Sequence, residues 1–232
     1  MGKIYRKSVD PCHGREDFDK KYYRRFFDKY SKKEFEVYCR WAEGWISFLE
    51  RYLDIKEGRG RTLLELGASL GYFARVFKNR GFDVSASDIS SYIIKKAKFF
   101  QKDINFFKLN IEKGIKDNSR FDYIVAFEVL EHLKSPEKAL GNIKMMLEKD
   151  GVLIFSTPFP TKRSLADPTH INVHESLWWL NLGRKSGFRR RRVIYATFMP
   201  FLYRISKYFS FGFPIRLNLP YVNSTCFLIF EK

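Results

Sequence analysis

From residue 61 onwards, short apolar runs alternate with segments in which apolar residues recur at three- and four-residue steps. Short apolar runs are typical of buried strands, whereas the longer recurrence is typical of helices with one buried face. The pattern predicts strands at 61–66, 82–87, 104–109, 121–127, 151–157, 188–197 and 223–230, and helices at 71–80, 90–100, 135–149 and 174–186. Because the two kinds of element alternate, we expect βαβ units around a parallel sheet.

The ends of two helices are marked by residues that favour helix boundaries. Ser135 and Pro136 suit the N-cap and the first position of the helix at 135–149, and Gly151 is expected to follow its C-terminal end. Nearer the N-terminus, Ser31-Lys-Lys-Glu34 matches a capping box that opens an amphipathic helix, which Gly58-Arg-Gly60 should end. We therefore expect residues 1–58 to form a helical cap and residues 59–232 one α/β domain.

A glycine-spaced turn follows the first predicted strand. Gly67 and Gly71 lie where open α/β sheets bind ligands, and the missing Cβ of glycine lets a ligand approach the backbone closely. Asp88 ends the second strand, where an acid can accept hydrogen bonds from ribose hydroxyls. The turn is a poor match to the G-x-G-x-x-G pattern of dinucleotide sites, and Glu65 adds negative charge where a pyrophosphate would lie. A cationic adenosine ligand fits this charge better than a dinucleotide does.

Four segments then occur in an informative order: Glu65 to Gly71, Asp88, Phe121 to Leu133 with the core Glu128-Val-Leu-Glu131-His132, and Lys149 to Pro158. Together they resemble the motif series of class I S-adenosylmethionine-dependent methyltransferases. The resemblance covers about residues 61–160 strongly and the following residues weakly. It implies a doubly wound, seven-stranded, mostly parallel sheet of order 3-2-1-4-5-7-6, in which strand 7 is antiparallel.

The same resemblance implies S-adenosyl-L-methionine as the cofactor. The glycine turn would lie against the methionine moiety, Asp88 would bind the ribose, and Asn110 with Ile111 would contact adenine. Asn110 and Ser69 depart from the residues more common in the family. The cofactor-binding residues implied are Glu65, Gly67, Ala68, Gly71, Asp88, Ile89, Asn110, Ile111 and Glu128. Alternatively, the glycines serve only as strand–helix turns, and Asp88 caps the helix at 90–100.

Two histidines are candidates for acid–base catalysis. His132 follows the fourth strand, and His170 lies in the loop after the fifth, in Asp167-Pro-Thr-His170. That tetrapeptide resembles methyltransferases of cell-surface glycan and small-metabolite biosynthesis. A base assists methyl transfer when the acceptor is a hydroxyl. The alternative for both residues is a structural hydrogen bond to the backbone.

The net charge is +17, of which +9 lies in residues 161–232, so an anionic partner is favoured. Arg189 to Arg192 could form an anion site or could protect a sheet edge. Residues 198–217 mix aromatic and basic side chains and could form a lid, a dimer contact, an interfacial membrane patch or part of the core.

We expect transfer of a methyl group to an oxygen or nitrogen of a small acceptor, one that could carry a phosphate or a glycan. The alternatives are an RNA methyltransferase, for which no RNP, zinc or Asn/Asp-Pro-Pro-Tyr motif is present, and a non-catalytic adenosine-ligand binding module.

The three cysteines, Cys12, Cys39 and Cys226, are odd in number and far apart. A disulfide framework is therefore not expected, and a reducing cytoplasm is the expected location. Cys12-His13 lacks the further ligands that a structural metal site needs, so no metal is expected. No apolar run is long enough for a membrane-spanning helix.

Overall fold

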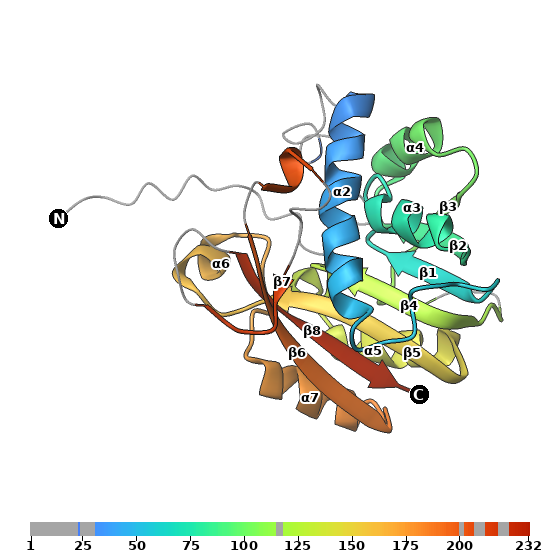
Figure 1. Ribbon diagram of the computed structural model, residues 1–232. Helices are drawn as coiled ribbons and strands as arrows, with labels where there is room; N and C mark the ends of the chain where they lie inside the picture. The colour runs from blue at the N-terminus through green and yellow to red at the C-terminus, as the bar shows by residue number, and fades with distance from the viewer. Residues whose placement is uncertain (1–22, 24–30, 115–117, 200–201, 207–211, 218–222) are drawn as a thin grey trace.

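The computed structural model describes residues 23, 31–114, 118–199, 202–206, 212–217 and 223–232. Within them, one sheet has the strand order β3-β2-β1-β4-β5-β8-β6-β7 (Figure 1). The strands are β1 (Thr62–Leu66), β2 (Asp83–Asp88), β3 (Asn105–Lys108), β4 (Phe121–Phe127), β5 (Leu147–Pro158), β6 (Arg190–Phe198), β7 (Gly212–Phe213) and β8 (Asn223–Glu231). β1 to β5 pair in parallel, whereas β8 is antiparallel to both β5 and β6. The predicted order is confirmed, with β8 as the antiparallel strand 7 and the short β7 added at the edge.

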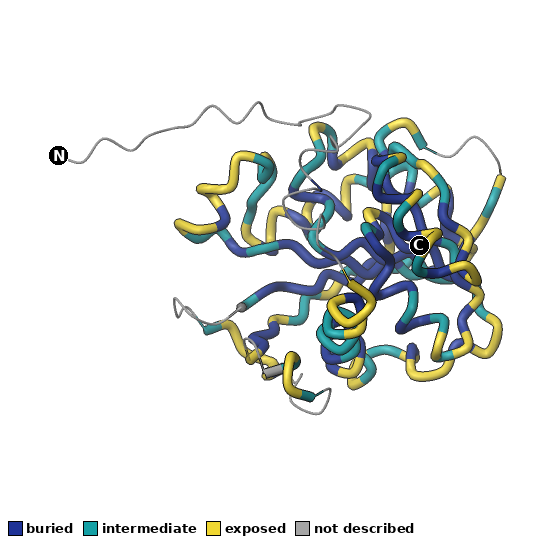
Figure 2. The backbone as a smooth tube through the Cα atoms, turned by 90° about the horizontal axis from the view of Figure 1, so that it is seen from above, coloured by how far each residue is buried: buried dark blue, intermediate teal, exposed yellow. Residues whose placement is uncertain are grey.

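Helices cover both faces of the sheet, as expected for a doubly wound fold. They are α2 (Lys32–Leu49), α3 (Tyr72–Asn79), α4 (Ser91–Phe100), α5 (Pro136–Met146), α6 (Lys162–Ala166) and α7 (Ser176–Lys185), with 3₁₀ turns η1 (Leu130–His132) and η2 (Leu202–Arg204). Leu63 packs in one hydrophobic core with α2, α3 and α4, and Leu64 packs in the other with α5 and α7. The strands therefore lie buried between partly exposed helices (Figure 2).

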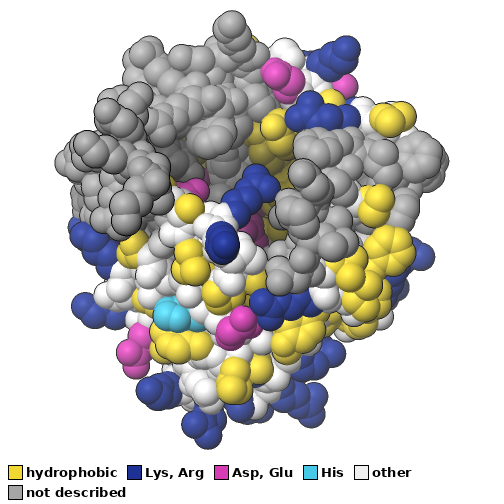
Figure 3. All heavy atoms as spheres, turned by 90° about the vertical axis from the view of Figure 1, so that its left-hand side faces the viewer, with side chains coloured by type: hydrophobic (Ala, Val, Ile, Leu, Met, Phe, Trp, Pro, Cys, Tyr) yellow, Lys and Arg dark blue, Asp and Glu magenta, His cyan; other side chains and the backbone are white. Residues whose placement is uncertain are grey.

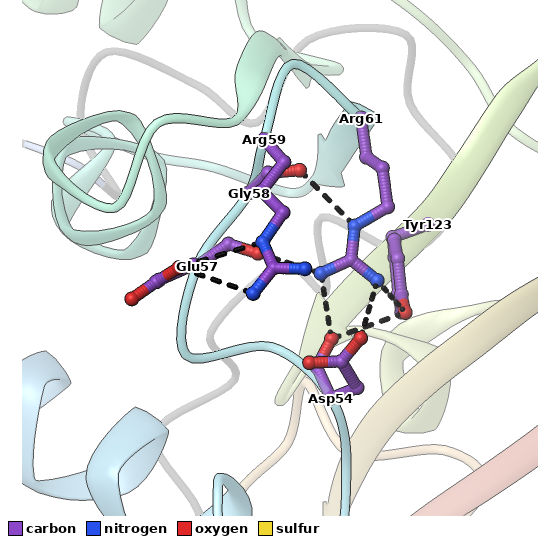
Figure 4. A network of polar contacts seen from close by, with 6 residues as sticks. All are labelled: Asp54, Glu57, Gly58, Arg59, Arg61 and Tyr123. Atoms are coloured by element: carbon purple, nitrogen blue, oxygen red, sulfur yellow. Dashed lines mark hydrogen bonds and ion pairs between the residues drawn. The ribbon is translucent and has the colours of Figure 1, made fainter.

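The predicted capping box is confirmed, because Ser31 Oγ accepts from the Glu34 N–H while Glu34 accepts from the Ser31 N–H. α2 nevertheless ends at Leu49, well before the predicted stop at Gly58 to Gly60. The connection to β1 is held instead by Arg61, whose guanidinium donates to the carbonyl oxygens of Asp54 (2.9 Å) and Gly58 (3.1 Å) (Figure 4). Arg61 also donates to the Tyr123 hydroxyl at 2.9 Å, which ties this connection to β4.

The boundary between α5 and β5 differs from the prediction. α5 ends at Met146, and Leu147 already pairs with Phe121. The register then shifts, so that Val152 pairs with Tyr123 and the residues between form an irregularity in the strand. Gly151 therefore does not mark the end of the helix. Its missing Cβ instead avoids the Phe121 carbonyl oxygen, which would lie 3.0 Å away.

Part of the segment at 198–217 can be located. Met199, Ile205, Phe213 and Ile215 expose their apolar side chains, whereas Phe201, Tyr208 and Phe209 lie outside the described residues. Figure 3, which looks onto the left-hand side of Figure 1, shows hydrophobic and basic side chains mixed on one face. Of the helices in the described part of the chain, none combines the length and the apolar character that crossing a bilayer requires. The lid, dimer-contact and membrane readings of this segment stay predictions.

Candidate cofactor and acceptor site

A cavity of about 430 Å³ opens where β1, β2, β3 and β4 reach their carboxyl ends. This is the edge at which open α/β sheets bind ligands. Nine residues proposed from the sequence line it together: Glu65, Gly67, Ala68, Asp88, Ile89, Asn110, Ile111, Glu128 and His132. Gly71 and His170 are not among the residues that line the cavity.

The two glycines of the turn have different surroundings. Both have positive φ angles, 64° at Gly67 and 77° at Gly71, which favour glycine. Gly67 faces the cavity beside Val129, whereas a Cβ on Gly71 would lie 2.6 Å from the Phe106 ring. Gly71 is also the N-cap residue of α3, so it shapes the turn from behind the cavity wall.

Asp88 presents a nearly buried carboxylate at the end of β2. Its oxygens accept from the N–H groups of Ser69 (3.0 Å) and Ser90 (2.9 Å), and from the Tyr23 hydroxyl at 3.2 and 3.3 Å. Burial raises the pKa of Asp88, and these hydrogen bonds partly offset the rise. Since Ser90 is the N-cap residue of α4, Asp88 supports the start of that helix as well as the cavity wall.

Glu65 lies beneath the glycine turn with only 4% of its surface exposed. It accepts a hydrogen bond of 2.7 Å from Ala74 N–H, in the first turn of α3. Burial raises the pKa of Glu65 to about 8; the Ala74 hydrogen bond lowers it and the nearby Asp88 carboxylate raises it further. In the free protein this carboxyl is therefore mostly protonated at neutral pH, and a bound cation would favour its ionised form.

Asn110 and Ile111 follow β3 and form the neighbouring part of the wall. The Asn110 side-chain oxygen accepts from Glu112 N–H at 3.0 Å, and the Ile111 carbonyl accepts from Asn142 at 2.7 Å. Leu109 N–H donates to the Asp88 carbonyl oxygen at 3.0 Å. The ends of β2 and β3 are thus held side by side, with Asp88 close to Asn110.

On the other side of the cavity, Glu128 directly follows β4 in a left-handed conformation with φ 55°. Its carboxylate accepts from the hydroxyls of Ser156 (2.7 Å) and Thr225 (3.1 Å), which belong to β5 and β8. Burial raises the pKa of Glu128, while those hydrogen bonds and the charge of His170 lower it. Three strands therefore fix one carboxylate at the cavity wall.

The structure brings the two predicted histidines together. The ring centroids of His132 and His170 are 4.8 Å apart, at an interplanar angle of 64°. His132 Nδ1 lies 2.9 Å from the Thr169 carbonyl oxygen, and His170 Nδ1 lies 3.0 Å from that of Ser164. The backbone hydrogen bonds expected of structural histidines are therefore present, and the Nε2 atoms of His132 and His170 lie 3.8 and 3.9 Å from the carboxylates of Glu131 and Asp167.

A family model described as a methyltransferase domain matches residues 35–192 of the chain. The chain belongs to this methyltransferase family. It is a class I, S-adenosylmethionine-dependent enzyme, and the methyltransferase therefore has the cofactor that its motif series implied.

Curated relatives match somewhat less than half of the methyltransferase. Ubiquinone biosynthesis O-methyltransferase of Coxiella burnetii is 30% identical over 116 residues, which are 48% of either chain. The protein of that name from Rickettsia canadensis is 28% identical over 99 residues, or 41% of this chain and 42% of the relative. The methyltransferase thus spans about half the length of these relatives.

Solved structures share the fold of the methyltransferase. A possible histamine N-methyltransferase from Thermotoga maritima has a TM-score of 0.65 at 18% identity, covering 90% of this chain and 97% of that one. Phosphoethanolamine N-methyltransferase 2 of Haemonchus contortus, in complex with S-adenosyl-L-methionine, has a TM-score of 0.61 at 14% identity, covering 90% and 60%. At these identities the likeness concerns the fold alone.

The arginine run of the methyltransferase lies away from the cavity. Arg189 donates to Asp150 at 2.8 Å, and Arg190 and Arg192 lie 3.6 and 3.9 Å from the Glu231 carboxylate. None of these arginines lines the cavity. The run therefore adds nothing to the cavity wall and flanks the paired ends of β6 and β8, and its two possible roles, an anion site or protection of a sheet edge, stay predictions.

Several residues of the cavity were not foreseen. Tyr38 and Trp41 of α2 line it, together with Tyr23 and with Tyr72 and Phe73 of α3. Tyr38 and Trp41 belong to the same three- and four-residue repeat as the core residues Trp45 and Phe48, so the pattern of α2 did not mark them as cavity residues. Glu131 was also missed as a site residue. It sits in the Glu128-x-x-Glu131-His132 segment and is completely buried beside both histidines.

Proposed function

We propose that the enzyme transfers the methyl group of S-adenosylmethionine to a hydroxyl oxygen of a small, partly apolar acceptor. The observation that carries this proposal is the polar cluster of Glu131, His132 and His170, of which His132 lines a cavity that also has aromatic residues of α2 and α3 in its wall. An amine nucleophile needs only to be neutral, whereas a hydroxyl needs a group that helps it to lose its proton. The O-methyltransferase relatives support the same choice.

In this proposal the cofactor lies along Glu65, Gly67, Ala68, Asp88, Ile89, Asn110 and Ile111. Its sulfonium end would point towards Glu128 and His132, where the cofactor and acceptor parts of the cavity meet. The acceptor oxygen attacks the methyl carbon in line, the carbon–sulfur bond breaks, and the sulfur leaves as a neutral thioether. Holding the two reactants aligned accounts for much of the rate. Tyr38, Trp41 and Phe127 would position the apolar body of the acceptor.

The acceptor class can be tested by transfer of a labelled methyl group. The enzyme is incubated with labelled S-adenosylmethionine and, in separate reactions, a hydroxylated aromatic acid, a primary amine, a phosphorylated amino alcohol and RNA. We expect label on the hydroxyl compound. Label only on the amine compounds or on RNA would contradict the proposal. Arg189 and Arg190 of the arginine run are ion-paired and lie away from the cavity, so they do not form an RNA-binding surface beside it.

The raised pKa of Glu65 predicts that cofactor affinity depends on pH. Below about pH 8 the free site holds a proton on Glu65, and the positive sulfonium favours its loss. The apparent affinity should therefore rise with pH, by up to about tenfold per pH unit, and level off above the free-site pKa. Calorimetry with S-adenosylmethionine at pH 6, 7 and 8, in two buffers of different ionisation enthalpy, measures both the affinity and the proton release.

The matched control for this experiment is Glu65→Gln. The α-amino group of the cofactor titrates identically against both proteins, so the difference between their pH profiles belongs to Glu65. The variant should lack both the rise in affinity and the extra proton release that Glu65 gives the wild-type protein, so the difference between the two profiles should vary with pH up to about pH 8. Identical profiles for the two proteins would rule out the proposed coupling.

The state of the cysteine side chains bears on the compartment in which the enzyme works. Cys39 and Cys226 form no disulfide within the described residues, and Cys12 lies outside them. Burial raises the pKa of both thiols to about 12, which keeps them protonated and unreactive. We propose a reducing compartment such as the cytoplasm.

A further inference from the structure

Three metal-ligating side chains converge at the edge of the cavity. One carboxylate oxygen of Glu131 and one ring nitrogen each from His132 and His170 lie within 4.8 Å of one another. His132 Nε2 is 3.8 Å from Glu131 Oε1. A tetrahedral ion with ligand distances of about 2.1 Å would bring its donors to about 3.4 Å apart. Side-chain shifts on the order of 1 Å would therefore close the set around an ion.

Glu131 has surroundings that a buried carboxylate does not usually have. Its side chain is fully buried, and neither of its oxygens has a hydrogen-bond partner among the described residues. Burial raises its pKa well above the ordinary value, and the neighbouring Glu128 raises it further. Buried polar atoms are normally satisfied, so two orphan oxygens in one carboxylate call for a missing partner. A cation is a partner that satisfies both.

The histidines are prepared as ligands by their backbone contacts. When Nδ1–H donates to a carbonyl oxygen, as the geometry at Thr169 and Ser164 indicates, the lone pair lies on Nε2. This arrangement, with one ring nitrogen held by a carbonyl and the other facing a ligand, is the usual second shell of a metal-bound histidine.

The backbone holds the two halves of the cluster in place. The Glu131 carbonyl oxygen accepts from the N–H groups of Ile171 (3.0 Å) and Asn172 (2.9 Å), so the loop carrying His170 is fastened to η1. Asn172 also donates through its side chain to the Leu133 carbonyl oxygen. These contacts hold the loop against η1 and so keep His170 at a fixed separation from Glu131.

We propose that Glu131, His132 and His170 bind one divalent transition-metal cation at the acceptor side of the cavity. Two imidazoles and one carboxylate suit Zn²⁺, Fe²⁺ or Mn²⁺ better than Mg²⁺, which prefers oxygen ligands. Three protein ligands leave positions open, and His132 places them at the cavity wall. Glu128 and Asp167 lie nearby and add negative charge that a cation neutralises. This assignment replaces the expectation that no metal is bound.

The role of the ion rests on the proposed function. An acceptor hydroxyl that occupies an open position would have its pKa lowered by the cation and would release its proton to solvent. The resulting oxygen then attacks the methyl carbon, while the carbon–sulfur bond breaks and the sulfur takes its electron pair. His132 and His170 act here as ligands, in place of the base suggested by the sequence.

Metal binding can be measured without methyl transfer. The full chain, stripped with chelator, is titrated with Co²⁺ while its visible absorption is followed, and with Zn²⁺ and Mg²⁺ by calorimetry. We expect saturation at one Co²⁺ or Zn²⁺ per chain and Mg²⁺ affinity at least ~100-fold weaker, because imidazole donors favour the transition metals. Absence of saturable Co²⁺ and Zn²⁺ binding by the wild-type protein would overturn the proposal, and so would Mg²⁺ binding as tight as theirs.

Variants locate the ion. Glu131→Gln and His170→Asn should each weaken Co²⁺ and Zn²⁺ binding by at least ~100-fold, since outer-shell changes alone cost 10–100-fold. Glu137→Gln and His174→Asn make the same chemical changes outside the cluster and should bind as the wild type does. Unchanged binding by both cluster variants would refute the site. His170 lies in a loop, so His170→Asn remains informative if the buried Glu131→Gln fails to fold.

The site and the proposed function can fail separately. Methyl transfer to a hydroxyl that continues in chelator, together with no metal binding, would leave the function standing without the site. Stoichiometric metal binding with transfer only to amines would leave the site standing without the function.

Discussion

Asp88→Ala is expected to weaken S-adenosylmethionine binding by about 100-fold or more. The buried carboxylate lies at the cavity with both oxygens held by Ser69 and Ser90, so it is preorganised to accept two ribose hydroxyls. A hydrogen bond to a charged group contributes about 1.5–3 kcal/mol, and two of them correspond to at least ~100-fold in affinity. Calorimetry with S-adenosylmethionine and with its demethylated product measures the loss, and labelled transfer should fall with it.

A matched variant separates binding from general damage. Asp83→Ala removes an exposed carboxylate from the other end of the same strand and should leave the affinity unchanged. If Asp88 serves only to support the start of α4 through Ser90, Asp88→Ala would lower the free energy of unfolding but leave the affinity unchanged. That combination would remove Asp88 from the cofactor site. Tyr23→Phe adds a further comparison, because it removes a donor to Asp88 while keeping the carboxylate.

The sheet could be predicted because its signals are local. Runs such as Leu63 to Leu66, apolar except for Glu65, are buried on both faces, and this pattern is recognisable from the sequence of the strand alone. The α5–β5 boundary could not be predicted because it depends on a distant contact. Leu147 leaves the helix to pair with Phe121, and no local feature distinguishes Leu147 from another helical leucine. Gly151 matched the pattern of a helix end, but glycine is needed there because a Cβ would lie 3.0 Å from the Phe121 carbonyl oxygen.

The candidate site likewise has a part that could be predicted from the sequence and a part that could not. Glu65, Gly67 and Asp88 occur at the ends of consecutive strands, so the parallel sheet brings them to one edge. The cluster around Glu131 depends on the loop carrying His170 returning to η1, which follows from two backbone hydrogen bonds that leave no trace in the sequence. The aromatic lining from α2 depends on where that helix lies across the sheet, and amphipathicity alone does not fix this position.

Trp45→Ala is expected to lower the free energy of unfolding by about 3–5 kcal/mol, the usual cost of deleting a fully buried aromatic side chain. Trp45 is 1% exposed, and its ring lies 5.7, 5.9, 5.2 and 5.1 Å from the rings of Phe73, Phe127, Phe198 and Phe227. These partners belong to α3, β4, β6 and β8, so no single element can close the cavity left by the indole. Urea unfolding, followed by circular dichroism, measures the change.

Trp178→Ala provides the matched control, because Trp178 is 36% exposed and its removal should lower the free energy of unfolding far less.

The same unfolding experiment tests the role of the N-terminal region. Most of residues 1–30 lie outside the described part of the chain; for residues 31–58 of the predicted cap we propose that they are built into the core, since α2 shares one hydrophobic cluster with the sheet. One cooperative transition, displaced as a whole by Trp45→Ala, is then expected. A separate early transition that the variant shifts alone would show that the cap unfolds independently. Because α2 also contributes Tyr38 and Trp41 to the cavity, loosening it should weaken acceptor binding along with stability.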